Sequence, residues 1–175
     1  MLSPPAMKLV HNHLLINPAD VVLGREQDGY QDLRQRIRSA IFWSLVHEPA
    51  TYSSSYVFTD FQTNNHLGEK VMKEYAKCAK DRDTVYIPIV LTCDLDTNLT
   101  RCEAPDRAHS GKLVDKQLLR KFRNHTELYS FHHDYATLEL DVSTLSAADA
   151  AKQILRHVLN LAPELSVHVI SPVPL

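Results

Sequence analysis

Residues 84–92, TVYIPIVLT, form a mostly apolar run rich in β-branched side chains, and this run constrains the fold more than any other stretch. A short run of this kind predicts a strand that is buried on both faces. The pattern changes directly after it, because residues 95–102 carry apolar side chains at helical spacing. Asp94 or Asp96 can cap that helix. A buried strand that leads through a polar turn into a helix is the repeating unit of α/β proteins.

The same alternation continues along the chain. Strand-like runs lie at residues 7–16, 55–61 and 135–142. Amphipathic stretches that predict helices lie at residues 30–47, 66–80, 113–129 and 147–161. Strands that alternate with helices imply right-handed βαβ units, so we expect an α/β fold of three layers, α/β/α, with helices on both faces of a mainly parallel sheet. The strands of that sheet are expected near residues 9–15, 56–59, 85–91 and 137–140.

Length and composition indicate an ordinary globular chain. Its 175 residues predict one domain, with a tail at residues 1–6 and a C-terminal extension at 162–175 whose strand-like run, 165–170, offers an oligomer contact. A net charge of −2 argues against a nucleic-acid partner. Three cysteines without CxxC spacing indicate reduced thiols. No apolar run reaches transmembrane length, so the sequence predicts a cytoplasmic protein without a membrane partner.

Four segments follow one another between residues 11 and 146: HNHLLINPAD, SYVFTDF, VLTCDLDTNLTR and YATLELDVSTLS. With the triplet PDR at 105–107, they resemble the P-loop small-molecule kinases, the group that includes gluconate, shikimate and chloramphenicol kinases. The resemblance covers residues 9–159 and implies a kinase-like domain in which residues 101–129 form a lid-like helical segment. It also implies a Walker B-like position for Asp60.

Three basic residues of the lid-like segment are the predicted cofactor-binding side chains: Arg101, Arg107 and Lys112. Arginine can donate two parallel hydrogen bonds to a phosphate or a carboxylate, and in the resembled kinases lid arginines close over the transferring phosphates. The alternative is a solvated basic helix face, which needs no ligand.

The HNH triplet at residues 11–13 lies where kinases of this group often have an aspartate that takes the proton of the acceptor hydroxyl. A neutral imidazole can do this near physiological pH. His11, His13 and Asp60 are therefore the predicted catalytic residues, although histidines exposed to solvent are the commoner case. A metal site would require residues 132–134 to fold beside the HNH triplet, and we predict no metal.

The glycine-rich loop of the resembled kinases, G-x-x-x-x-G-K-[ST], does not occur in this sequence. The only Gly-Lys pair is Gly111–Lys112, and Asp106 stands where the motif requires an earlier glycine. The loop supplies most of the phosphate binding in P-loop proteins. We therefore expect no cofactor, and MgATP only if such a loop comes from outside this chain. Either the chain is an incomplete product of a longer gene or it is repurposed.

These observations leave several functions open. The first is a divergent kinase-like protein that keeps a pocket for a small anionic or polar ligand but lacks ATP phosphotransfer. The second is a small-molecule kinase whose Walker A region is missing from this chain. A repurposed enzyme that uses the histidines, for instance a metal-dependent hydrolase, is the third. In each case the pocket is expected at the carboxyl ends of the strands, where Asp60, a histidine and Arg101 or Arg107 would converge.

The missing loop also removes the first strand of the resembled kinases, which lies between the third and fourth. We expect direct pairing of residues 56–59 with 85–91 to close the gap, because buried backbone groups without partners are costly. Insertion of residues 165–170 is the alternative.

Overall fold

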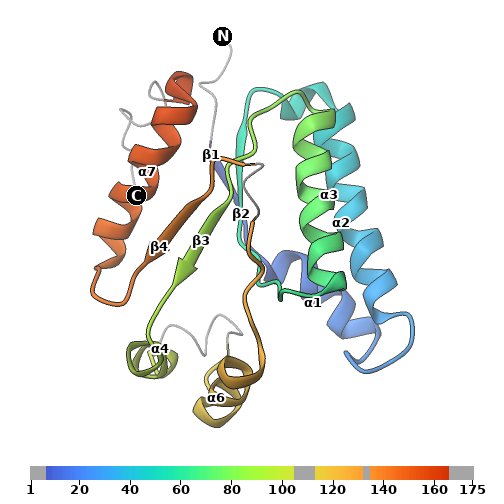
Figure 1. Cartoon of the computed structure of the whole chain (residues 1–175). Helices are drawn as coiled ribbons and strands as arrows, with labels where there is room; N and C mark the ends of the chain where they lie inside the picture. Colours follow the sequence, from blue (N-terminus) through green and yellow to red (C-terminus); the bar gives the residue numbers. More distant parts are fainter. Residues whose placement is uncertain (1–6, 105–112, 132–134, 166–175) are drawn as a thin grey trace. The chain divides into compact units, whose positions relative to one another are not determined.

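The computed structural model describes residues 7–104, 113–131 and 135–165 as a mixed α/β structure (Figure 1). Its contacts divide the chain into two compact units. Unit 1 comprises Met1–Phe61, Lys70–Val85 and Leu165–Leu175, and unit 2 comprises Gln62–Glu69 and Tyr86–Glu164. We describe each unit by itself.

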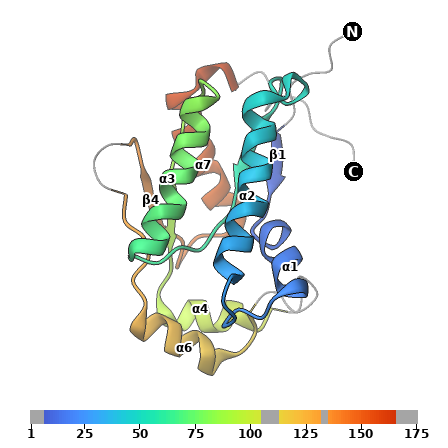
Figure 2. The same cartoon turned by 90° about the vertical axis from the view of Figure 1, so that its right-hand side faces the viewer.

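Unit 1 is built on a two-stranded parallel sheet covered by two long helices. Met7 lies opposite Ser55 and Val10 lies opposite Phe58 in this sheet. Helices α2 and α3 run side by side in both views (Figures 1 and 2). The elements, in chain order, are β1 (Met7–Val10), α1 (His13–Val22), α2 (Tyr30–His47), the short 3-10 helix Pro49–Thr51, β2 (Ser55–Phe58) and α3 (His66–Asp81), whose first turn belongs to unit 2.

Three aromatic rings form the centre of the core of unit 1. The ring of Phe42 on α2 lies 5.0 Å from that of Tyr75 on α3 and 5.7 Å from that of Phe58 on β2. The rings of Phe58 and Tyr75 are 5.3 Å apart, and all three pairs meet edge to face. This geometry suits the quadrupoles of aromatic rings. The cluster therefore joins the sheet to both helices.

A buried ion pair connects the same two helices. Arg38 on α2 donates from Nε and Nη2 to Oε2 of Glu74 on α3, at 2.7 and 2.6 Å. The two side chains are only 5% and 19% exposed. Oε1 of Glu74 is buried and has no hydrogen-bond partner in the described part of the chain. Within the described part of the chain, the negative charge of Glu74 is thus balanced by Arg38.

Arg82, the residue after α3, holds the connection between α2 and β2. Its Nη1 donates to the carbonyl of Leu45 and to Oγ1 of Thr51, the latter at 2.8 Å. Its Nη2 donates to the carbonyls of Thr51 and Ser54 at 2.6 and 3.2 Å. The guanidinium carbon also lies 5.4 Å from the centres of two tyrosine rings. One side chain therefore binds three backbone carbonyls between the end of α2 and the start of β2.

Unit 2 contains a second two-stranded parallel sheet. Ile89 lies opposite Leu138 and Thr92 lies opposite Asp141. The elements of unit 2 are β3 (Ile89–Thr92), α4 (Leu95–Cys102), α6 (Lys116–His125), β4 (Leu138–Asp141) and α7 (Ala147–Leu161). The 3-10 helix Pro163–Leu165 follows, and its last residue belongs to unit 1.

The parallel pairing and the helices at residues 30–47, 66–80 and 147–161 are confirmed, but the single sheet of four strands is wrong. β2 and β3 belong to two different sheets, so the described residues do not show the expected pairing of 56–59 with 85–91. The alternative cannot be judged, because residues 166–170 lie outside the described ranges. The three-layer arrangement stays a prediction.

The expected strand at residues 7–16 is also wrong beyond Val10, because α1 begins at His13. An apolar run this short fits either period, and here the helix buries Leu15 and Ala19, which are 3% and 0% exposed. That burial outweighs the helix-breaking effect of Pro18 within α1. β3 is likewise shorter than expected, starting after Pro88, which has no N–H to donate.

Candidate functional site

The predicted catalytic residues lie at one edge of the sheet in unit 1. His11 follows the end of β1, and Asp60 lies two residues after the end of β2. Because these strands are parallel, their carboxyl ends lie at the same edge. The backbone N–H of Asn12 donates to Oγ1 of Thr59 at 3.2 Å and so connects the two strand ends. The imidazoles of His11 and His13 are 6.3 Å apart and inclined by 51°.

The carboxylate of Asp60 is engaged by the protein itself. Its Oδ1 accepts the backbone N–H of Phe61 at 2.8 Å, and its Oδ2 accepts the hydroxyl of Tyr75 at 3.0 Å. Tyr75 is 7% exposed and belongs to the aromatic core. The contacts of Asp60 therefore fasten the end of β2 to α3.

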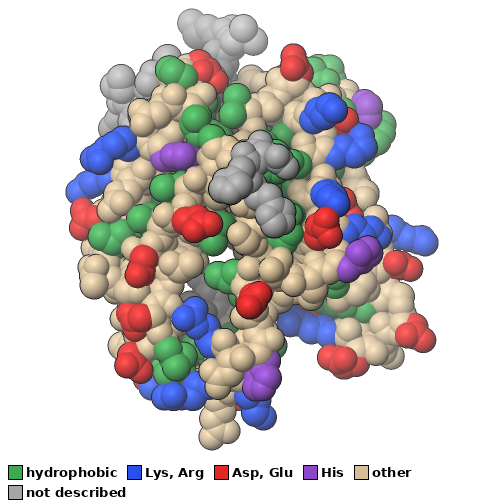
Figure 3. Space-filling model, in the orientation of Figure 1, with side chains coloured by type: hydrophobic (Ala, Val, Ile, Leu, Met, Phe, Trp, Pro, Cys, Tyr) green, Lys and Arg blue, Asp and Glu red, His purple; other side chains and the backbone are tan. Residues whose placement is uncertain are grey.

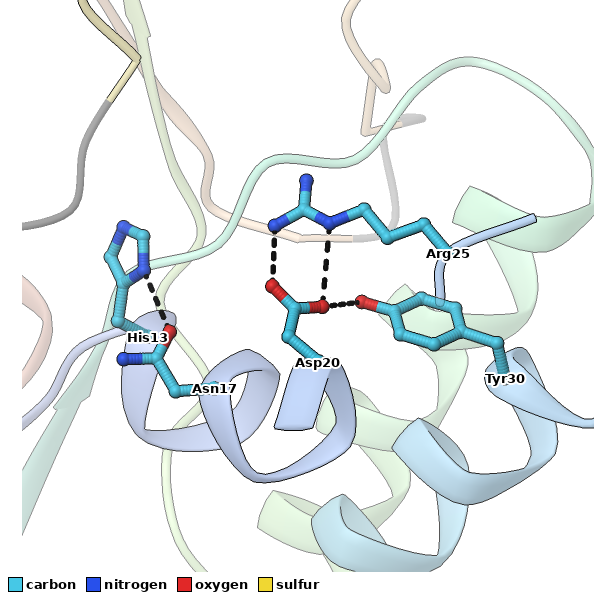
Figure 4. Close-up of polar contacts among 5 residues, drawn as sticks. All are labelled: His13, Asn17, Asp20, Arg25 and Tyr30. Carbon is cyan, nitrogen blue, oxygen red and sulfur yellow. Dashed lines mark hydrogen bonds and ion pairs between the residues drawn. The ribbon is translucent and has the colours of Figure 1, made fainter. Parts of the chain in front are cut away.

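His13 opens α1, and its ring is oriented by the same helix. Its Nδ1 lies 3.1 Å from Oδ1 of Asn17, one turn further on (Figure 4). An amide oxygen accepts hydrogen bonds, so in the neutral imidazole Nδ1 carries the proton and Nε2 keeps a lone pair. His13 is thereby held in the tautomer that can accept a proton at Nε2.

A second polar cluster, which the sequence analysis missed, lies further along α1. Asp20 shares the helix face of His13 and Asn17, because residues four and seven apart lie on one side. Its Oδ2 accepts Nη2 of Arg25 at 2.7 Å, and its Oδ1 accepts Nε of Arg25 at 3.3 Å and the hydroxyl of Tyr30 at 2.5 Å (Figure 4). The one signal in the sequence is the polar stretch GREQDG, residues 24–29, which contains an arginine and precedes the helical stretch 30–47.

The cluster shifts the ionisation of its members. The hydrogen bond from Arg25 lowers the pKa of Asp20 and has the largest effect. Burial opposes it, and the hydrogen bond from the Tyr30 hydroxyl, with a smaller effect than burial, lowers the pKa further. Burial raises the pKa of Tyr30, and the hydrogen bond to Asp20 raises it further. The native state therefore favours a charged Asp20 beside a neutral Tyr30.

Asp20→Asn is expected to make the stability of the protein less dependent on pH in the acid range. A carboxyl whose pKa is depressed by folding contributes stability that is complete above its ordinary pKa of 3.8. That contribution is lost as the pH falls through the lower native pKa. The difference in Tm between wild type and Asp20→Asn should be present at pH 7 and shrink below about pH 3.8.

Thermal unfolding followed by circular dichroism measures this difference, with Asp28→Asn in the exposed loop as the matched control. A difference in Tm that stays constant from neutral pH to about pH 2.5 would contradict the electrostatic account of Asp20.

Arg101, the predicted phosphate ligand of unit 2, holds the loop after β4. Its Nη2 donates to the carbonyls of Ser143 and Leu145 at 3.3 and 3.1 Å. Its Nη1 lies 3.7 Å from Sγ of Cys93. The guanidinium thus connects the end of β3, through α4, to the loop that follows the neighbouring strand.

The carboxyl ends of β3 and β4 are joined by further hydrogen bonds. Asp94 caps α4, as predicted, by accepting the N–H of Thr97 at 2.8 Å, which lowers the pKa of Asp94. Its own N–H donates to Oγ of Ser143 at 2.7 Å. Oδ1 of Asp141 accepts both the N–H and the hydroxyl of Ser143, and the hydroxyl bond lowers the pKa of Asp141. The two strand ends form one connected polar network.

The remaining predicted site residues cannot be placed. Arg107, Lys112 and the triplet 132–134 lie outside the described ranges. Arg101 belongs to unit 2, whereas His11, His13 and Asp60 belong to unit 1, so their convergence on one ligand stays a prediction.

The described part of the chain lacks two kinds of feature. Within residues 7–104, 113–131 and 135–165, no group of three or more His, Cys, Asp or Glu side chains could hold a metal ion. In the same ranges, none of the helices has both the length and the apolar character that crossing a bilayer requires.

Comparisons with family models, with curated proteins and with solved structures give no match, so membership of a family stays a proposal.

Proposed function

We propose that this chain is a divergent P-loop kinase-like protein that binds a small anionic or polar ligand and does not transfer phosphate from ATP. The observation that carries the proposal is the engagement of Asp60. In the resembled kinases a Walker B-like acid faces the metal and its water, whereas here both carboxylate oxygens accept donors from Phe61 and Tyr75. The Nη groups of Arg101 likewise donate to two backbone carbonyls and contact Sγ of Cys93.

The ligand is placed by this proposal at the carboxyl edge of β1 and β2. Ligands of open α/β sheets bind outside the carboxyl ends of their strands. Here the exposed His11 and the half-buried His13 offer ring N–H donors to an anion when their imidazoles are protonated, and the N-terminus of α1 adds a favourable dipole. The first turn of α1 contains no acidic residue that would oppose one. This edge therefore suits a phosphate or carboxylate group.

A second function is favoured by the contact between His13 and Asn17. With Nδ1 bound to the amide oxygen, Nε2 of His13 is a proton acceptor, which is what a general base requires. A repurposed enzyme that abstracts a proton from a small hydroxyl substrate is the function that this contact supports.

Calorimetry and NMR test the first of these functions. We expect no binding of MgATP in the low micromolar range, because the chain has no glycine-rich phosphate loop. Inorganic phosphate at millimolar concentration should shift the ring resonances of His11 and His13 but not those of the control His157. Calorimetry should show binding of phosphate by the wild type that is lost in the double variant His11→Asn/His13→Asn.

Three outcomes are decisive. Micromolar binding of MgATP that is lost on Asp60→Ala would overturn the proposal and return the protein to the kinases. Equal shifts at His157 would remove the anion site. Binding of phosphate without loss in the double variant would place the ligand elsewhere.

A further inference from the structure

Helix α6 has one face fixed to its own unit by two polar contacts. Lys116 pairs with Glu103 at 2.7 Å, and Nη2 of Arg123 donates to the carbonyl of Cys93 at 2.7 Å. These two basic residues are seven positions apart and therefore share one side of the helix. That side faces α4 and the end of β3, and α4 and α6 lie side by side in both views (Figures 1 and 2).

The other side of α6 exposes large apolar groups. Leu118 and Phe122, four residues apart on one helical stripe, are 40% and 47% exposed. Leu118 lies about 200° around the helix from Lys116, because each residue turns the helix by about 100°. Val114, just before the helix, is 46% exposed. None of the residues of α6 is buried. We call Val114, Leu118 and Phe122 the apolar stripe.

The apolar stripe lies on a strongly basic helix. Between Lys116 and His125 the helix has four Lys or Arg residues and no acid, although the whole chain has a net charge of −2. Arg120 and Lys121 are exposed. In Figure 3, Lys and Arg side chains occur at the lower end of the view, where Figure 1 places α4 and α6, as well as on other parts of the same face. The helix thus concentrates positive charge on an otherwise acidic chain.

We propose that α6 is a docking surface for an anionic lipid bilayer, which the apolar stripe enters while Lys121, beside the stripe, contacts the acidic headgroups. Arg120 lies on the far side of the helix from the stripe and adds to the electrostatic attraction at longer range. A short helix with a basic polar face and with Phe and Leu on the other face is the pattern of interfacial membrane helices. An apolar stripe alone or a basic face alone anchors a protein weakly, whereas the two together anchor it well.

A lipid surface fits this helix better than a folded protein partner. Ten residues of helix extend about 15 Å. One exposed face of so short a helix offers much less than the roughly 1,000 Å² that a specific protein interface buries in total. A bilayer, by contrast, requires no complementary shape. The expectation of no membrane partner rested on the lack of a spanning segment, and a surface contact does not require one.

Co-sedimentation of the full chain with lipid vesicles tests the proposal. We expect binding to phosphatidylcholine vesicles that contain about 30% phosphatidylserine, little binding to phosphatidylcholine alone, and loss of binding in about 1 M salt, where the Debye length is about 3 Å. Leu118→Ser/Phe122→Ser and Arg120→Gln/Lys121→Gln should each weaken binding at least about tenfold.

Matched controls lie on other helices. Trp43→Ser removes an apolar side chain that is 58% exposed on α2, and Lys77→Gln/Lys152→Gln removes two exposed charges from α3 and α7. Both should bind vesicles as the wild type does, and circular dichroism should show that every variant is folded.

Several results would overturn the proposal. The wild type could fail to bind vesicles that contain phosphatidylserine, or bind both lipid compositions equally. The two α6 variants could retain wild-type binding. Sedimentation velocity could show a dimer that is lost in Leu118→Ser/Phe122→Ser, in which case a second copy of the chain covers the apolar stripe.

Discussion

Glu74→Ala is expected to lower the free energy of unfolding by about 3–5 kcal/mol. The substitution removes the carboxylate that compensates Arg38, whose side chain is only 5% exposed. The guanidinium would then remain buried between α2 and α3 without a counter-charge. Its desolvation, rather than the lost attraction, produces most of the effect. Urea unfolding measures the change directly.

Two variants give this experiment its reference points. Asp81→Ala breaks the exposed pair with Lys77 and should cost less than about 1 kcal/mol. Arg38→Met/Glu74→Leu removes both buried charges and should recover most of the loss, because apolar groups of similar volume can replace a buried ion pair. If Glu74→Ala cost no more than Asp81→Ala, the pair would not be buried in solution.

Phe42→Ala is the other substitution expected to cost about 3–5 kcal/mol. Phe42 is 8% exposed, and its ring contacts those of Phe58 and Tyr75. Alanine leaves a cavity at the junction of β2, α2 and α3, since the surrounding rings close it only in part. The loss should appear as a lower urea midpoint with an unchanged slope.

Phe61→Ala serves as the matched control, because that ring is 55% exposed. Exposed positions without special contacts usually change stability by less than about 0.5 kcal/mol. Equal effects of the two substitutions would mean that the aromatic cluster is not the core of unit 1.

Periodicity predicted the long helices because their signal is local. The bounds of α2 match residues 30–47, and Phe42 and Leu45 are buried on this helix. Parallel pairing also followed from the alternation of strands and helices. The division into two sheets could not be predicted, since strand neighbours depend on contacts between distant segments. α1 was missed because LLI fits either period and Pro18 suggested an end.

In the candidate site, too, some features could be predicted from the sequence and others could not. Asp60 and the histidines were predicted at one sheet edge, because the carboxyl ends of parallel strands coincide. The hydroxyl of Tyr75, which donates to the carboxylate of Asp60, comes from α3, and no spacing in the sequence indicates this contact. The cluster of Asp20, Arg25 and Tyr30 was equally hidden, because the position of Arg25 depends on the path of a loop.

The hydrogen bonds of Arg82 determine which parts of unit 1 open together. If the connection between Leu45 and Ser54 opened, the guanidinium of Arg82, next to the end of α3, would lose its carbonyl acceptors. Partially buried charges without partners are costly, so the loop gains little freedom by detaching alone. The connection and the last turn of α3 should therefore exchange their amide hydrogens as one cooperative foldon, although most surface loops of this length fray independently.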